Sequence, residues 1–177
     1  MGRENTGAGA VFRDTEDATV NATVDFLRDP LDPAALASEP ELRRALADAA
    51  TPSKRARAAG RLGDLLRVKG AYDDALLLAE AIALSDPASE PTQRLRYAVC
   101  LQYAGRHSEA LFAFAEVRAD GALRSYHEQH LGKCLVEMGE VERGLAHLRA
   151  ARTLRAGEPA LLASTEQAIA AAERLAR

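Results

Sequence analysis

The chain has 177 residues, a length that suits one domain, alone or with an additional arm. Hydrophobic residues make up 47% and charged residues 28%, as in an ordinary soluble globular protein, and the net charge of −3 gives no reason to expect nucleic acid or an anionic membrane as a partner. No apolar run is long enough to span a bilayer, and the N-terminus lacks the apolar core of a signal peptide, so the sequence predicts a cytoplasmic protein.

Acidic residues are concentrated near the N-terminus. Residues 1–50 contain ten acidic and five basic side chains, a net charge of −5, whereas the other 127 residues contain 16 acidic and 18 basic ones, a net charge of +2. This asymmetry indicates an acidic arm that could dock on a mildly basic body.

The first 50 residues divide into a tail and an arm. Residues 1–13 include three glycines and few apolar side chains, which indicates a tail without fixed structure. Over residues 14–50 we expect a helical arm or cap. Val20, Val24 and Leu27 follow helical spacing, although the same stretch also alternates like a strand. No other segment offers a strand to pair with, so a helix is favoured.

Cap signals predict where the later helices begin. Ser38 followed by Glu41 predicts a capping box that opens a helix through about Ala49, and Thr51 followed by Pro52 predicts an N-cap and a first helical position. Further helices are predicted at 52–69, 71–85, 91–104 and 108–118. A capping box at Ser125 and Glu128 predicts the start of a helix that ends near Met138, and the partner of that helix is predicted to end at Gly157. A last helix is predicted at 160–175. The predicted buried side of the helix at 71–85 is Leu76, Leu77, Ala79, Ile82 and Ala83.

Glycine recurs at a nearly constant interval through these helices. Gly70, Gly105 and Gly139 are 35 and 34 residues apart, and glycine after a helix predicts a left-handed C-cap. Small residues recur in register where two helices must approach closely: Gly63, Ala98 and Gly132 upstream, and Ala75, Ala110 and Gly144 downstream. This framework predicts a repeated helix-turn-helix unit of about 34 residues.

The pattern resembles the tetratricopeptide repeat family. The resemblance implies an all-α fold, a right-handed helical-repeat solenoid of antiparallel helix pairs preceded by the N-terminal helical arm. It places three repeats at about 56–90, 91–124 and 125–157 within residues 51–157. It also implies a capping helix at 158–177, because a last repeat without a neighbour would expose a core-like face.

The resemblance further implies a binding site, because the first helices of such repeats line a concave groove that holds a segment of another protein. The groove residues that it implies are Asp64, Arg67, Val68, Leu95, Val99, Gln102, Tyr103, Tyr126, Gln129, Lys133, Val136 and Glu137. Their apolar and aromatic centre beside mixed polar groups suits an extended or helical peptide. The alternative that the chain's own N-terminal arm fills the groove stays open.

Chaperone-binding members of the family hold a terminal carboxylate with lysine, asparagine and arginine at set groove positions. In this chain those positions are occupied by Gly60, Asp64, Arg96, Tyr126 and His130. The resemblance therefore does not support recognition of a heat-shock chaperone tail.

Few residues suggest catalysis. The sequence contains no Gly-rich phosphate loop, zinc-protease motif, serine elbow or CxxC pair, so we expect neither enzymatic activity nor a bound cofactor or metal. His127 and His130 share one side of a predicted helix, but nothing places a third ligand beside them, and a solvated or partner-facing pair is favoured.

Two other groups invite an interpretation. Cys100 and Cys134 are 34 residues apart, at equivalent places in successive repeats, and are interpreted as buried packing residues. A basic cluster is interpreted as a solvated helix face, with docking of an acidic segment as the alternative, although an exposed ion pair contributes only about 0–1 kcal/mol. The cluster consists of Lys54, Arg55, Arg57 and Arg61.

Two functional hypotheses follow. The first is a non-catalytic adaptor that binds one segment of a partner protein in the groove. The second is a secretion-type chaperone that holds an extended segment of a client protein, because proteins of that class are of similar length and place N-terminal helices before three repeats. The second hypothesis brings with it a homodimer formed through the N-terminal arm. An enzyme, or a regulatory domain of one, is disfavoured.

Overall fold

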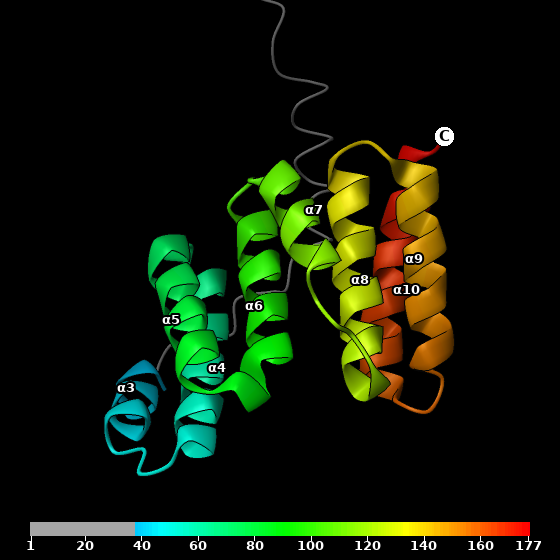
Figure 1. Ribbon diagram of the computed structural model, residues 1–177. Coiled ribbons are helices and arrows are strands. Elements are labelled where there is room, and N and C mark those ends of the chain that lie inside the picture. The colour runs from blue at the N-terminus through cyan, green and yellow to red at the C-terminus, as the bar shows by residue number, and fades with distance from the viewer. Residues whose placement is uncertain (1–37) are drawn as a thin grey trace, which may run out of the picture.

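The computed structural model describes residues 38–177, so the predictions for the tail at 1–13 and for the arm at 14–37 lie outside the described residues. Within the described range the chain forms α-helices and one 3₁₀ helix and contains no strand (Figure 1). The helices are α3 (Glu39–Ala47), α4 (Pro52–Val68), α5 (Tyr72–Ser85), α6 (Glu90–Tyr103), α7 (His107–Ala115), α8 (Gly121–Glu137), α9 (Val141–Leu154) and α10 (Pro159–Leu175), with the 3₁₀ helix at Pro87–Ser89.

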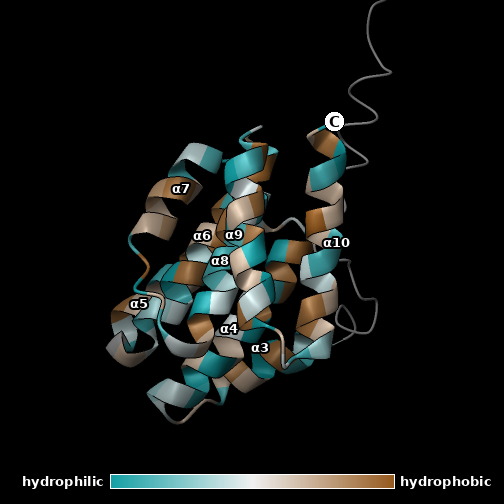
Figure 2. Cartoon of the chain, turned by 90° about the vertical axis from the view of Figure 1, so that its right-hand side faces the viewer, coloured by the Kyte–Doolittle hydropathy of each residue, from teal (hydrophilic) through white to brown (hydrophobic). Residues whose placement is uncertain are grey.

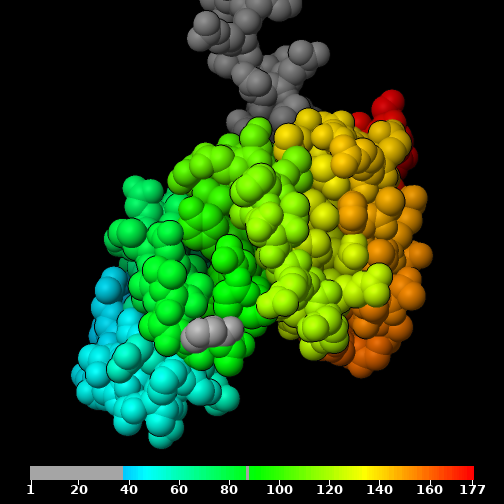
Figure 3. All heavy atoms as spheres, viewed as in Figure 1, coloured from blue at the N-terminus to red at the C-terminus, as the bar shows by residue number. Residues whose placement is uncertain are grey.

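Neighbouring helices pack in sequence order from α3 to α10 (Figure 1). The space-filling view shows the same order across the visible face, from cyan near the N-terminal end to orange near the C-terminal end (Figure 3). The contact of α7 with α8 is less extensive than the contact of α8 with α9. The predicted all-α class is therefore confirmed for the described residues. None of their helices combines the length and the apolar character that crossing a membrane requires.

Local signals explain several helix ends. The side chain of Thr51 accepts a hydrogen bond from the backbone N–H of Lys54 at 3.3 Å, so the predicted N-cap of α4 is confirmed. The three repeated glycines have φ angles of +82°, +74° and +83°, which confirms the predicted left-handed caps. At each cap the next backbone N–H bonds five residues back at 2.9 Å: Ala71 to Leu66, Arg106 to Leu101, and Glu140 to Leu135.

Packing buries one side of most helices, and teal and brown residues accordingly alternate around them (Figure 2). One core cluster extends from Leu42 on α3 to Cys134 on α8. A second joins α8 and α9 to α10 through residues such as Leu148 and Ile169, so α10 covers the apolar side of the last helix pair. Cys100 and Cys134 are buried and not joined in a disulfide bond, which confirms their interpretation as packing residues.

The closest helix contact described lies between α8 and α9. A Cβ atom added to Gly132 would lie 2.8 Å from Leu148 Cγ and 2.9 Å from the Gly144 carbonyl oxygen, and one added to Gly144 would lie 2.7 Å from the Gly132 carbonyl oxygen. These two positions therefore require glycine for packing. Gly63 is less constrained, because its added Cβ would have its nearest neighbour, Leu78 Cδ2, at 4.0 Å.

Two predictions of local structure are wrong. Leu77 was expected on the buried side of α5, but 65% of it is exposed, because it lies about 200° around the helix from Ala75 at 3.6 residues per turn. The capping box at Ser125 does not form, since α8 already begins at Gly121. The added turn brings Leu123 against the core, and Ser125 instead donates a hydrogen bond to the Ala122 carbonyl oxygen.

Other helix ends differ slightly from the predictions. Ser38 does precede α3, but its side chain does not form the predicted capping hydrogen bond, and α3 ends at Ala47 rather than near Ala49. Helix α7 ends at Ala115, three residues before the predicted end. After it, the backbone N–H of Val117 bonds to the Phe114 carbonyl oxygen, and the Val117 side chain is buried.

We predict that Gly132→Ala destabilises the protein by about 1–3 kcal/mol, because the added methyl group overpacks the α8–α9 contact. Gly63→Ala is the matched control at the equivalent repeat position. It should leave stability unchanged or raise it by up to about 1 kcal/mol, since alanine favours helix and has room there. Urea unfolding checks both variants, and equal destabilisation by the two would contradict the packing argument.

We also predict that neither native cysteine reacts with iodoacetamide at pH 8 in the folded protein. Burial raises the pKa of the Cys100 thiol to about 11, so little reactive thiolate forms at that pH. Mass spectrometry should find both cysteines labelled only after urea is added. A cysteine introduced at exposed Ala163 is the positive control, and rapid labelling of the native cysteines would contradict their burial.

Candidate functional site

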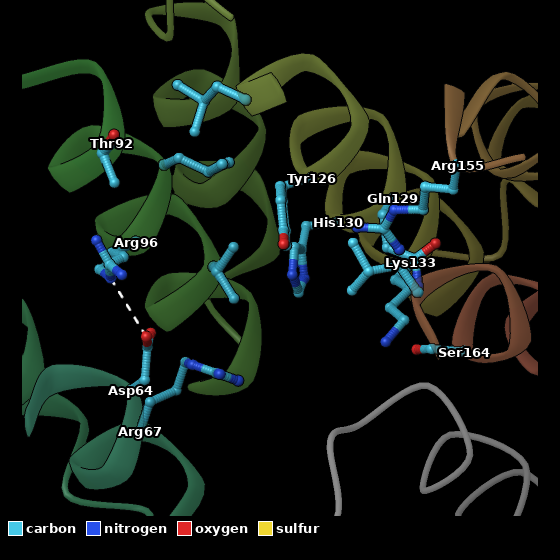
Figure 4. Close-up of a pocket in the computed structure, with 14 residues that line it drawn as sticks. Asp64, Arg67, Thr92, Arg96, Tyr126, Gln129, His130, Lys133, Arg155 and Ser164 are labelled. Carbon is cyan, nitrogen blue, oxygen red and sulfur yellow. Dashed lines mark hydrogen bonds and ion pairs between the residues drawn. The ribbon is translucent and has the colours of Figure 1, made fainter. Parts of the chain in front are cut away.

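A groove of about 480 Å³ lies between α4, α6 and α8 and is bounded by the start of α10 (Figure 4). Helix α4 contributes Asp64 and Arg67, and Figure 4 shows their side chains facing those of α6. The other lining residues are Thr92, Leu95, Arg96, Val99, Leu123, Tyr126, Gln129, His130, Lys133, Arg155, Leu161 and Ser164. The groove combines aliphatic side chains with several cations.

Most of the residues predicted from the resemblance lie here. Those that line the groove are Asp64, Arg67, Leu95, Val99, Tyr126, Gln129 and Lys133. Five do not line it: Val68, Gln102, Tyr103, Val136 and Glu137. Val136 is buried against the α9 contact, where its Cγ2 lies next to Gly144.

Gln102 and Glu137 join helices instead of facing a ligand. The Gln102 side-chain amide donates a hydrogen bond to Glu137 Oε2 at 3.3 Å, and His107 Nε2 lies 3.1 Å from the same oxygen. Both side chains are almost fully buried. Because these contacts connect α6 and α7 to the end of α8, they stabilise the helix arrangement next to the groove.

Tyr103 is buried and supports the groove from behind. The guanidinium carbon of Arg67 lies 4.2 Å from the centroid of the Tyr103 ring, within the range of a cation–π interaction. Tyr103 therefore orients a groove residue without lining the groove.

The C-terminal boundary of the groove was not predicted. Arg155 lies just after α9 and is 98% buried, with its guanidinium carbon 4.9 Å from the centroid of the Tyr126 ring. Its Nη1 donates a hydrogen bond to Thr165 Oγ1 at 3.0 Å, which attaches it to α10. Reasoning from the first helix of each repeat excluded this region, so Arg155, Leu161 and Ser164 were missed.

Arg96 and His130 also line the groove, although in the sequence they were considered as groove residues only at the positions that chaperone-binding repeats use. Arg96 is four residues after Thr92, and His130 is four residues after Tyr126, so each pair shares a helix face. Figure 4 shows Tyr126 and His130 side by side on α8. Arg96 Nε donates a hydrogen bond to Asp64 Oδ2 at 3.3 Å, and the dashed line in Figure 4 marks this pair.

Gly60 leaves the space that Arg96 occupies. A Cβ atom added at Gly60 would lie 2.7 Å from the guanidinium carbon of Arg96. Gly60 was considered in the sequence only because chaperone-binding repeats use this position. In the structure its small size makes room for a groove residue.

Positive charge predominates in the groove. Among the described lining residues the four cations are Arg67, Arg96, Lys133 and Arg155, and the single carboxylate is Asp64. Lys133 and Arg155 are each only 2% exposed. Water screens charges in such a cleft less than charges on an open surface.

Gln129 places a polar acceptor at the groove wall. The residue is 98% buried, and within the described part of the chain its Oε1 atom accepts no hydrogen bond. A buried acceptor without a donor costs about 1–3 kcal/mol. A peptide N–H in the groove would remove that cost.

The histidine pair and the basic cluster that were singled out in the sequence do not form one site with the groove. His127 Nε2 lies 3.0 Å from the Phe114 carbonyl oxygen, whereas His130 lines the groove. In residues 38–177, no three side chains of His, Cys, Asp or Glu are grouped so that they could hold a metal ion. The basic cluster from Lys54 to Arg61 is exposed, as its interpretation as a solvated face requires.

We predict that Tyr103→Ala and Tyr126→Ala affect stability differently. Tyr103 is 7% exposed, so its truncation should leave a cavity and cost about 3–5 kcal/mol. Tyr126 is 39% exposed, and its loss should cost less than about 1.5 kcal/mol. Thermal and urea unfolding measure both, and similar losses would contradict the assignment of Tyr103 as a support residue.

Comparison with protein-family models finds no match to this sequence. Comparison with curated proteins finds no match, and comparison with solved structures finds none either. The tetratricopeptide assignment therefore stays a prediction from the repeated residues.

Proposed function

We propose that the chain is a non-catalytic adaptor, a right-handed tetratricopeptide-like solenoid of three helix pairs that binds an extended segment of another protein. The observation that carries this proposal is the groove shared by α4, α6 and α8, the helices that the repeat pattern makes the first of each pair. The same glycine cap at the end of each of these helices supports the repeat.

The lining chemistry supports a peptide as the ligand. Aliphatic side chains on three helices offer apolar contact, and Gln129 Oε1 offers an acceptor to a backbone N–H. Tyr126 is 39% exposed, so a ligand can bury more of its ring, and aromatic residues are common anchors at interfaces. Together these groups suit an extended backbone with apolar side chains.

The charge of the groove narrows the class of peptide. Four cations face one carboxylate among the described lining side chains. Two of the cations are held in place by aromatic rings, Arg67 by Tyr103 and Arg155 by Tyr126. Cations that are already ordered lose little conformational entropy when a ligand binds. The preferred segment therefore carries Asp or Glu beside apolar residues, and a cytoplasmic location for this interaction stays a prediction.

Selection from a displayed peptide library tests the proposal. Selected peptides should be enriched in Asp and Glu next to aromatic or branched residues, and fluorescence anisotropy should give a Kd that rises at higher salt. Gln129→Leu and Lys133→Met should each weaken binding of a selected peptide by about tenfold or more, since loss of a buried polar contact costs more than about 1.4 kcal/mol.

Leu84→Ala is the matched control, because Leu84 is 81% exposed and does not line the groove. Its affinity should equal that of the unmodified chain, and circular dichroism should show that all variants remain folded. Peptides whose affinity is unaffected by both groove variants would show that the ligand binds elsewhere and would contradict the proposal.

A further inference from the structure

The groove has a candidate ligand in the same chain. We propose that residues 14–32 bind in the groove and block it until a partner segment displaces them. This inference rests on the proposed function, because it specifies how access to the same groove is regulated.

Charge complementarity is the first argument. Residues 14–32 contain six acidic side chains and one basic side chain, a net charge of −5. The described groove lining has four cations and one carboxylate, and two of the cations are 98% buried. The net charge of the segment is therefore opposite in sign to the net charge of +3 on the described groove lining, so the two are electrostatically complementary.

Apolar complementarity is the second argument. Between Asp17 and Asp29 the segment carries four apolar side chains suited to a groove that is partly aliphatic, namely Val20, Val24, Phe26 and Leu27. The apolar part of the groove consists of Leu95, Val99, Leu123 and Leu161. Because exposed ion pairs alone contribute little, burial of these side chains is what would hold the segment in place.

The connection to the described domain allows the segment to reach the groove. Only residues 33–37 separate the segment from Ser38, and α3 packs on α4, which supplies Asp64 and Arg67 to the groove. An extended chain spans about 3.3–3.6 Å per residue, so Phe26 can lie up to about 40 Å from Ser38. A domain of this size has a radius of gyration of about 14 Å. The short tether also gives a high effective concentration.

A second cationic surface is the alternative docking site for the same segment. Lys54, Arg55, Arg57 and Arg61 are exposed on α4, outside the groove lining. Exposed charges are screened by water and salt, and this cluster is not accompanied by the aliphatic lining that the groove has. The groove is therefore the preferred site, and the cluster provides a control with the same change in charge.

Distance measurement in the full chain tests where the segment lies. Spin labels on Thr23→Cys and Ala163→Cys place one label in the segment and one on α10, next to the groove residue Ser164. The native cysteines are buried and should remain unlabelled. We expect a short, narrow distance distribution that persists when labelled chains are diluted with unlabelled ones. Arg96→Gln with Lys133→Met should broaden it, whereas Arg57→Gln with Arg61→Gln should not.

Binding of a synthetic peptide with the sequence of residues 14–32 tests the blocking. The variant with Asp25→Asn, Asp29→Asn and Asp32→Asn weakens the internal segment in the full chain. This variant should bind the labelled peptide at least about tenfold more tightly than the unmodified chain does. The reason is that the apparent affinity equals the intrinsic affinity multiplied by the fraction of molecules whose groove is open. Adding Lys133→Met to this variant should abolish the gain.

The outcomes separate this inference from the proposed function. Equal peptide affinity in the unmodified chain and the Asn variant, or a distance distribution that only the Arg57 and Arg61 changes broaden, would overturn self-blocking. A distance signal that disappears on dilution would assign the segment to a second copy and would also overturn it. In each case a library-selected peptide that still needs Gln129 would leave the adaptor proposal standing. If no peptide depends on the groove residues, both fail.

Discussion

The left-handed glycine at the end of α4, α6 and α8 is the constraint on which the other features of the structure depend. At Gly70, Gly105 and Gly139 the chain reverses through the same hydrogen-bonded cap, which other residue types adopt only with strain. Each reversal returns the next helix along its predecessor, and the three capped helices all contribute to one groove. The groove is thus a consequence of repeated chain reversal.

Packing between the helix pairs then decides the shape and charge of that surface. Helix α8 packs closely on α9 through Gly132 and Gly144, while its contact with α7 is less extensive. The groove is lined by α4, α6 and α8, and the start of α10 bounds it. Aromatic rings order Arg67 and Arg155, so the groove presents preformed positive charge and a ligand need not order these side chains.

The proposed adaptor would need a means of discriminating among acidic segments. The proposed internal competitor would provide one, because only a partner with better apolar complementarity than residues 14–32 would displace it. The tether makes the internal segment effective even at low intrinsic affinity. In this proposal the acidic N-terminal residues and the cationic groove act together. The net charge of −3 for the whole chain does not reveal this separation of charge, because the two parts partly cancel.

The sequence by itself determined the helix pairs, because the caps at Gly70, Gly105 and Gly139 and the apolar spacing are local or periodic signals. The resemblance to tetratricopeptide repeats implied part of the groove lining, including Val99 and Gln129, and both residues line the groove. Only the tertiary structure decided that Tyr103 is buried, that α8 begins at Gly121, and that Arg155 reaches the groove. These features depend on how closely pairs pack and on how α10 covers the last one, and such long-range contacts leave no periodic signal in the sequence.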